Sequence, residues 1–174
     1  MKKCFLLFLL IFALPVCAET LTGGIKYTVD DAKIELRNNR PSASDYIVTQ
    51  NNFVDKDRNA NYFALLKGKT DFKDRILAMF SDGSYAVNYK NDLQHVWYYD
   101  KDGTLINVEF RTSLEYPYGS YKYSPDGELV NMSLRVSKDE TYIFSPFGEL
   151  LGHWVGDKCY DENGKVVMTR EIIK

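Results

Sequence analysis

Cys159 and His153 are the first residues to consider for chemistry, because a thiolate beside a base is a common nucleophilic pair. They lie close together in "HWVGDKCY" (153–160). A two-residue turn at Gly156 and Asp157 would pair Trp154 with Cys159 and His153 with Tyr160. The thiol and the imidazole would then lie on opposite faces of a hairpin. We therefore interpret Cys159 as a small buried thiol against Trp154.

Other short motifs resemble ion or phosphate sites, but their spacing argues against that chemistry. "GKT" (68–70) lacks the glycine that a phosphate-binding loop needs five residues earlier. "DKDG" (100–103) and "DENG" (161–164) resemble calcium loops, but Tyr98 and Cys159 stand where the first ligand would be. The two histidines, His95 and His153, show no zinc-site spacing with Cys159. We predict no catalytic residue, no metal and no cofactor.

Aromatic side chains are the remaining candidates for a functional surface. The chain contains 13 tyrosines, 10 phenylalanines and 2 tryptophans. Trp97, Tyr98 and Tyr99 stand in a row, and exposed rings of this kind can stack on sugars or on cell-wall peptides. In a strand, Trp97 and Tyr99 would share one face and Tyr98 would lie on the other. We predict a binding surface at Trp97–Tyr99, although core packing would explain the same aromatics.

These residues belong to an internal repeat that returns once per hairpin. The repeat centres on "FSDG", "DKDG", "SPDG", "SPFG" and "DENG", which end at Gly83, Gly103, Gly127, Gly148 and Gly164. An aromatic residue precedes each of the last four glycines by four positions: Tyr99, Tyr123, Phe144 and Tyr160. An aliphatic residue follows each of them by two positions: Leu105, Leu129, Leu150 and Val166.

The residue types at successive positions of the repeat are typical of a three-residue hairpin loop with a bulge. Asp or Ser in the first position binds nearby backbone amides, and Pro125 and Pro146 preset φ in the second. The glycine takes the left-handed conformation, where a Cβ would clash. After each turn, apolar and polar residues alternate along the chain. We expect Ile106, Val108 and Phe110 on one buried face, and Val130 with Met132 in the next unit.

Upstream of the repeat, the pattern is weaker. "IKYTVDDAKIELR" (25–37) reads as a hairpin that turns at Asp30 and Asp31. Residues 38–60 read as a long polar loop, and 62–67 and 75–80 as strands. Together these features predict an all-β fold, an antiparallel β-meander of tandem hairpins in a single domain. The domain comprises an N-terminal hairpin and loop (19–60) and a β-hairpin repeat region (61–174).

The repeats resemble three known types, over residues 75–170. "WYYDKDGTLINV" and "YKYSPDGELVNM" resemble tyrosine-aspartate (YD) repeats, and "CYDENGKVVMTR" resembles the variant MORN repeats of bacterial envelope proteins. "VWYYDKDGTL" is similar to choline-binding repeats of cell-wall proteins, but this match occurs once and those families need it in successive units. The resemblance implies β-hairpin architecture and carries over no ligand site.

The first 18 residues read as a secretory signal peptide. Lys2 and Lys3 precede an apolar run from Phe5 to Leu14, and small residues before Ala18 favour cleavage after it. The run is about half as long as a membrane span requires. A lipoprotein leader that keeps Cys17 is the alternative. We expect export to the periplasm or beyond, with no transmembrane segment in the mature chain.

Charge limits the range of partners. The formal net charge is −2, and removal of Lys2 and Lys3 makes the chain more acidic. No basic patch is evident, so we expect no nucleic-acid binding. We predict a non-enzymatic exported protein that binds an envelope protein or a glycan, through its aromatic surface or a free edge at "KVVMTREIIK" (165–174). A small hydrolase acting on cell wall or polysaccharide is the alternative, since catalytic carboxylates can be far apart in sequence.

Overall fold

The computed structural model describes residues 27–42 and 67–169. Within these ranges the chain forms one ten-stranded antiparallel sheet and one helix. The helix α1 spans Val29–Asn38. The strands are β1 (Arg75–Met79), β2 (Tyr85–Tyr89), β3 (Asp92–Tyr99), β4 (Leu105–Arg111), β5 (Tyr118–Tyr123), β6 (Leu129–Arg135), β7 (Glu140–Phe144), β8 (Leu150–Val155), β9 (Lys158–Tyr160) and β10 (Val166–Thr169).

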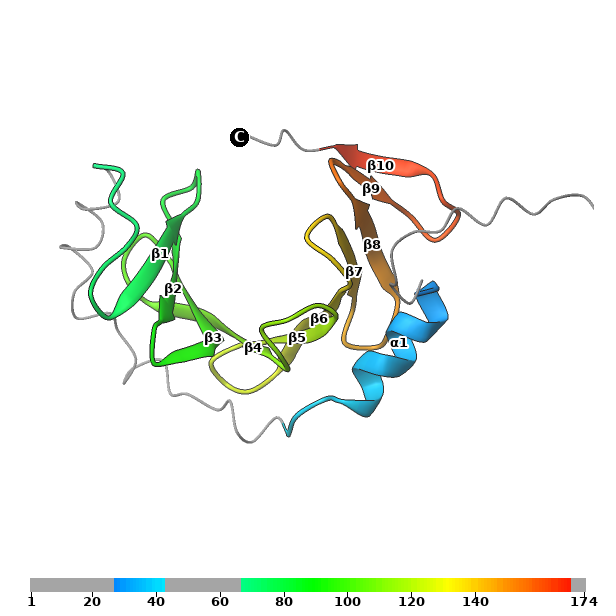
Figure 1. Ribbon diagram of the computed structural model, residues 1–174, viewed down its shortest axis with the longest axis horizontal. Helices are drawn as coiled ribbons and strands as arrows, with labels where there is room; N and C mark the ends of the chain where they lie inside the picture. The colour runs from blue at the N-terminus through cyan, green and yellow to red at the C-terminus, as the bar shows by residue number, and fades with distance from the viewer. Residues whose placement is uncertain (1–26, 43–66, 170–174) are drawn as a thin grey trace, which may run out of the picture.

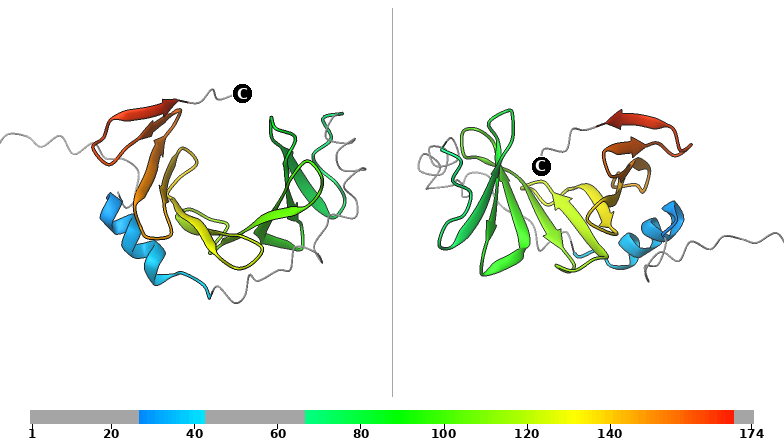
Figure 2. Two further views of the ribbon diagram at one scale, coloured as in Figure 1. Left: turned by 180° about the vertical axis from the view of Figure 1, so that it is seen from behind. Right: turned by 45° about the horizontal axis from the view of Figure 1, so that its top comes forward.

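The strands follow one another in space in chain order, so the predicted antiparallel meander is confirmed. The sheet curves into an open arc, with β1 to β3 in one arm and β8 to β10 in the other (Figure 1). Helix α1 lies outside the arc, on the convex face, against β6 and β7 (Figures 1 and 2). The opposite, concave face lies inside the arc.

The hairpin turns that contain the repeated glycines have the geometry that the repeat predicts. Gly83, Gly103, Gly127, Gly148 and Gly164 all have positive φ, between 74° and 86°. In the turn after β3, Asp100 Oδ1 accepts hydrogen bonds from the amides of Asp102 and Thr104, at 2.8 and 2.9 Å. Ser145 and Asp161 bind amides in the same way. The aspartates and serines of the repeat therefore stabilise turns.

A bulge after these turns corrects the predicted alternation. Tyr99 pairs with Leu105 but Tyr98 pairs with Asn107, so Ile106 is an extra residue in β4. As a result Leu105 is fully buried, whereas Ile106, expected in the core, is 39% exposed. The same shift between β5 and β6 leaves Val130 exposed. A bulge adds one residue to one strand, and the faces exchange at that point.

The predicted hairpin over 25–37 is wrong, because Val29–Asn38 is a helix. Thr28 and Asp31 form a capping box: Thr28 Oγ1 accepts from the Asp31 amide, and Asp31 Oδ2 accepts from the Thr28 amide, both at 3.1 Å. Ala32 and Leu36, one helical turn apart, are both buried. Two adjacent aspartates at Asp30 and Asp31 suit the first turn of a helix, where the helix dipole favours negative charge, as well as they suit a hairpin turn.

The core lies on the convex face and is dominated by tyrosines. Tyr85, Tyr99, Tyr121, Tyr123 and Phe144 are each at most 1% exposed. The helix joins this core through Leu36, whose carbonyl accepts a 2.6 Å hydrogen bond from the Tyr121 hydroxyl. Gly119 permits the close approach, since a Cβ there would stand 3.2 Å from Leu36 Cδ2. Most of the aromatic content of the repeat is therefore core.

Several sequence-based predictions lie outside the described residues. These are the signal peptide with its cleavage after Ala18, the polar loop from residue 43 to 60, and the strand expected at 62–66. The strand expected at 75–80 is present as β1. The ten strands all fall within the predicted repeat region, residues 61–174.

Candidate functional site

The predicted binding residues lie on opposite faces of β3, as the alternation indicates. Tyr99 is 1% exposed and stacks on Tyr85 in the convex-face core, at 5.3 Å between ring centroids. Trp97 packs partly buried against the same core. Tyr98 alone points to the concave face, opposite Ala86 on β2 and Asn107 on β4. Of the three residues, the structure therefore separates Tyr98 from the other two.

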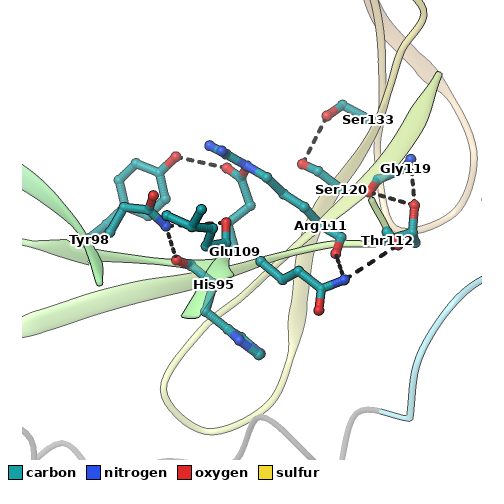
Figure 3. A network of polar contacts seen from close by, with 11 residues as sticks. His95, Tyr98, Glu109, Arg111, Thr112, Gly119, Ser120 and Ser133 are labelled. Atoms are coloured by element: carbon teal, nitrogen blue, oxygen red, sulfur yellow. Dashed lines mark hydrogen bonds and ion pairs between the residues drawn. The ribbon is translucent and has the colours of Figure 1, made fainter. Parts of the chain in front are cut away.

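Tyr98 is the first residue in a series of polar contacts across β3 and β4 (Figure 3). Its hydroxyl donates to Glu109 Oε2 at 2.7 Å, and Glu109 Oε1 accepts from Arg111 Nε at 3.1 Å. The Lys122 ammonium lies over the Tyr98 ring, 4.2 Å from its centroid. Burial raises the pKa of Tyr98 well above its usual value, and the negative charge of Glu109 raises it further. The phenol therefore stays neutral and holds the carboxylate in place.

Two serines lie at the bottom of a depression on the concave face. Arg111, Ser120, Ser133 and Ile143 are cross-strand partners on β4 to β7. The Ser120 and Ser133 hydroxyls are 3.2 Å apart and share a hydrogen bond (Figure 3). In the next row, Tyr118, Arg135, Thr141 and Trp154 are likewise partners. Because serine is much smaller than these neighbours, the pair leaves a depression between them.

This depression is a cavity of about 270 Å³, which we call the inner groove. It is lined by Tyr98, Glu109, Arg111, Tyr118, Ser120, Ser133, Arg135, Thr141, Ile143 and Trp154. The lining combines two guanidinium groups, four hydroxyl side chains besides that of Tyr98, and three aromatic rings. Such a mixture of a few polar groups with aromatic surface is typical of a binding site.

A more apolar cavity of about 220 Å³ adjoins the inner groove. Tyr98 and Arg111 line both cavities, and the apolar one extends over β1 and β2 to Ile76, Ala86 and Phe80. Ile76 and Phe80 are 43% and 44% exposed. The concave face thus offers a polar half and an apolar half that meet at Tyr98.

Arg135 carries the least satisfied polar atom of the inner groove. Its Nε is buried and has no hydrogen-bond partner among the described residues. One terminal nitrogen, Nη2, donates a long 3.4 Å bond to the Lys138 carbonyl, and the guanidinium lies 5.9 Å from the Tyr116 ring centroid. A buried donor left without a partner costs about 1–3 kcal/mol. Because Nε is enclosed, a ligand acceptor would meet the terminal nitrogens of Arg135 and not Nε.

The other candidate residues lie away from the inner groove or are engaged elsewhere. Cys159 is a buried free thiol opposite Trp154, and His153 lies opposite Tyr160 on the other face, as expected. His153 Nε2 contacts Glu140 Oε1 at 2.9 Å, and the His153 ring stacks on the Tyr142 ring. His95 Nδ1 contacts Asp92 Oδ1. Among the described residues, no three His, Cys, Asp or Glu side chains gather as a metal site.

The free-edge alternative falls on β10. Val166, Val167 and Met168 are 42–59% exposed, and in the described part of the chain β10 pairs with β9 alone. Residues 170–174 of the predicted edge lie outside the described ranges. Helix α1, the one helix among the described residues, lacks the length and the apolar character of a membrane span.

Sequence reasoning missed Glu109, Arg111, Ser120, Ser133 and Arg135 as functional residues. The alternation pointed to the apolar residues of β4 and β6 and indicated no role for the polar residues between them. The signal that could have found them is the repeated arginine at the end of "NVEFR" (107–111) and "NMSLR" (131–135). Only the register shows that β5 separates these strands and that both arginines line one cavity.

No family model, curated protein or solved structure matches this chain.

Proposed function

We propose that this chain is an exported, non-enzymatic β-repeat protein that binds an envelope partner or glycan through the inner groove. The observation that carries the proposal is the concave face itself. It presents two arginines, a serine pair and aromatic rings around one cavity, at positions where a folded core requires none of them. Core packing is provided separately by the tyrosines of the convex face. None of the residues that line the inner groove belongs to this core.

The carboxylate content of the inner groove supports binding over hydrolysis. A glycosidase generally needs two carboxylates about 5–10 Å apart. Among the described residues that line the inner groove, Glu109 is the sole carboxylate, and its two oxygens are held by Tyr98 and Arg111. A single carboxylate does not supply the pair that glycoside hydrolysis uses. The alternative of a wall hydrolase is thus less well supported than binding.

Export supports an envelope location for the partner. The apolar run from Phe5 to Leu14 behind Lys2 and Lys3 is the basis for export. The resemblance of "CYDENGKVVMTR" to the variant MORN repeats of bacterial envelope proteins agrees with it. The partner we propose is accordingly a protein or glycan of the periplasm or the cell surface.

The test uses two neighbouring aromatics on opposite faces. Trp97→Ala should lower the melting temperature, because Trp97 packs on the core, and should leave retention by the folded fraction unchanged. Tyr98→Ala should reduce retention of the purified protein on envelope extract, because Tyr98 borders both cavities. Equal retention by the folded fractions of both variants and the wild type would contradict binding through the inner groove. Turnover of wall material in a zymogram would instead show a hydrolase.

A further inference from the structure

We propose that the inner groove binds an acidic sugar, with a carboxylate at the arginines and sugar hydroxyls at the serine pair. The inference rests on the proposed function, because it names the ligand class of the same site. In this arrangement the carboxylate-bearing sugar occupies the polar half of the concave face. A neighbouring neutral sugar of the same chain lies over the apolar half, against Phe80 and Tyr98.

The charge of the inner groove differs in sign from that of the protein. The whole chain has a formal net charge of −2. The groove lining carries two arginines against one glutamate, and Lys122 adds a further positive charge above the Tyr98 ring. A guanidinium binds a carboxylate through paired, charge-assisted hydrogen bonds. A local positive site on an acidic protein favours a ligand with an isolated anionic group over a densely charged polyanion.

Arg135 supplies a second, independent reason to place an acceptor here. Its Nε is buried without a partner among the described residues, and the hydrogen bond from its Nη2 to the Lys138 carbonyl is long, at 3.4 Å. Arg111, by contrast, uses Nε to hold Glu109. Because Nε itself is enclosed, a ligand carboxylate would bind the terminal nitrogens of Arg135, whose hydrogen bond to Lys138 is long. Water or a neutral hydroxyl would do so more weakly, because the acceptor carries no charge.

The serine pair suits sugar hydroxyls. Ser120 and Ser133 share one hydrogen bond, and this bond uses one of their two hydroxyl protons. The other proton and the unused lone pairs remain for a ligand. A ring hydroxyl, which both donates and accepts, matches this arrangement. Tyr118 and Trp154 line the same cavity, and rings of this type can contact the apolar face of a sugar.

An extended peptide fits this face less well. Peptides that bind sheets usually add a strand at a free edge, where unpaired backbone groups hold them. The inner groove lies over β3 to β8, in the interior of the sheet, where each strand is already paired on both sides. Recognition there must be by side chains, and these are arginines, hydroxyls and aromatic rings. This set favours a glycan.

The first experiment uses the wild-type protein and a probe that alternates acidic and neutral sugars. In calorimetry at low salt, we expect a hyaluronan tetrasaccharide to bind and its carboxyl methyl ester to bind roughly tenfold more weakly or worse, since the ester removes the charge and keeps the shape. Added salt should weaken binding of the acid and leave binding of the ester unchanged. Equal affinity for acid and ester, or no binding of the acid, would overturn the proposal. Tighter binding of glucose 6-phosphate than of glucuronic acid would also overturn it, in favour of a phosphate site.

The second experiment changes one charge. Arg135→Gln should weaken tetrasaccharide binding roughly tenfold or more and abolish the preference for acid over ester. The matched control is Arg37→Gln, on α1 at the convex face, which should bind as the wild type does. Unchanged binding by Arg135→Gln, or an equal loss in Arg37→Gln, would contradict the site. If Arg135→Gln does not fold, the acid–ester comparison on the wild type still decides. Retention on envelope extract that depends on Tyr98, without any tetrasaccharide binding, would overturn this inference and leave the proposed function intact.

Discussion

At the residue scale, Tyr98 and Tyr99 show how adjacent, identical side chains acquire different roles. Tyr99 fills the core beside Tyr85. Tyr98, one position earlier, faces the concave side and holds Glu109 by a 2.7 Å hydrogen bond. The pleat of the strand alone separates them. Adjacent aromatic residues in a strand therefore lie on opposite faces of the sheet, whatever their type.

The hydroxyl of Tyr98 allows a prediction about alkaline pH. Tyr98→Phe should lower the free energy of unfolding by about 1 kcal/mol at neutral pH, because Glu109 loses a donor. The pKa of Tyr98 is raised above its usual value of 10.0 in the folded state. The bond therefore contributes fully below pH 10, and its contribution is lost as the pH rises through the folded pKa. Urea unfolding at several pH values measures this difference.

Tyr116→Phe is the matched control for that measurement. Tyr116 is 47% exposed, so removal of its hydroxyl should leave the unfolding midpoint unchanged. A Tyr98→Phe midpoint equal to that of the wild type at neutral pH would contradict the importance of the Tyr98–Glu109 bond.

Gly127 carries the second residue-scale prediction. Its φ is 86°, in the left-handed region where a side chain is strained. Gly127→Ala should therefore cost about 1 kcal/mol of unfolding free energy, which a thermal melt will show as a lower midpoint. Glu128→Ala, at the exposed next position in the same loop, serves as the control. If the two variants melt together, the turn does not require glycine.

At the element scale, α1 is the one part of the described fold that breaks the hairpin pattern. The helix covers the convex face at β6 and β7. Tyr121 on β5 and Tyr142 on β7 donate to the backbone carbonyls of Leu36 and Tyr27. The signal for it was present as threonine followed by aspartate three residues later, a capping-box pattern. The competing signal was the adjacent pair of aspartates, which also suits a hairpin turn.

Thr28→Ala tests the capping box of α1. Loss of the Thr28 hydroxyl should destabilise the helix by about 1 kcal/mol, measured as faster hydrogen exchange of the α1 amides. Hydrogen bonds from the Thr28 side chain and backbone lower the pKa of Asp31 below its usual 3.8. The cap therefore contributes above that pH and is lost as the pH falls through the lowered pKa.

The same pH dependence provides the check on Thr28→Ala. In the variant, exchange of the α1 amides should change less on acidification than in the wild type. Identical exchange in the two proteins at neutral pH would show that packing on the sheet, and not the cap, holds the first turn.

At the scale of the whole molecule, the curvature of the sheet separates two tasks. The convex face packs tyrosines and α1 into a core. The concave face gathers Arg111, Arg135 and the serine pair from β4, β5 and β6 around one cavity. Neither task needs the other's residues. Substitutions in the inner groove should consequently alter binding more than stability.

Export is the prediction that concerns the chain as a whole. Mass spectrometry of the protein isolated from its native host should find Glu19 as the first residue, because cleavage is expected after Ala18. A chain that still begins at Met1 would contradict export by this route. A lipid attached to Cys17 would show the lipoprotein alternative instead.

The sequence by itself determined the meander and its turns, because both depend on local chemistry. A glycine with Asp or Ser three positions before it specifies the turns at Gly103, Gly127, Gly148 and Gly164, and alternation specifies the strands between turns. Even the pairing of Trp154 with Cys159 followed from the two-residue turn beside them. The tertiary structure alone decided which residues share the inner groove. Arg111 on β4 and Arg135 on β6 have β5 between them, and both line one cavity because they face the same side of the sheet. It also decided between helix and hairpin at Val29–Asn38, where local signals were balanced and the burial of Leu36 on the sheet favours the helix.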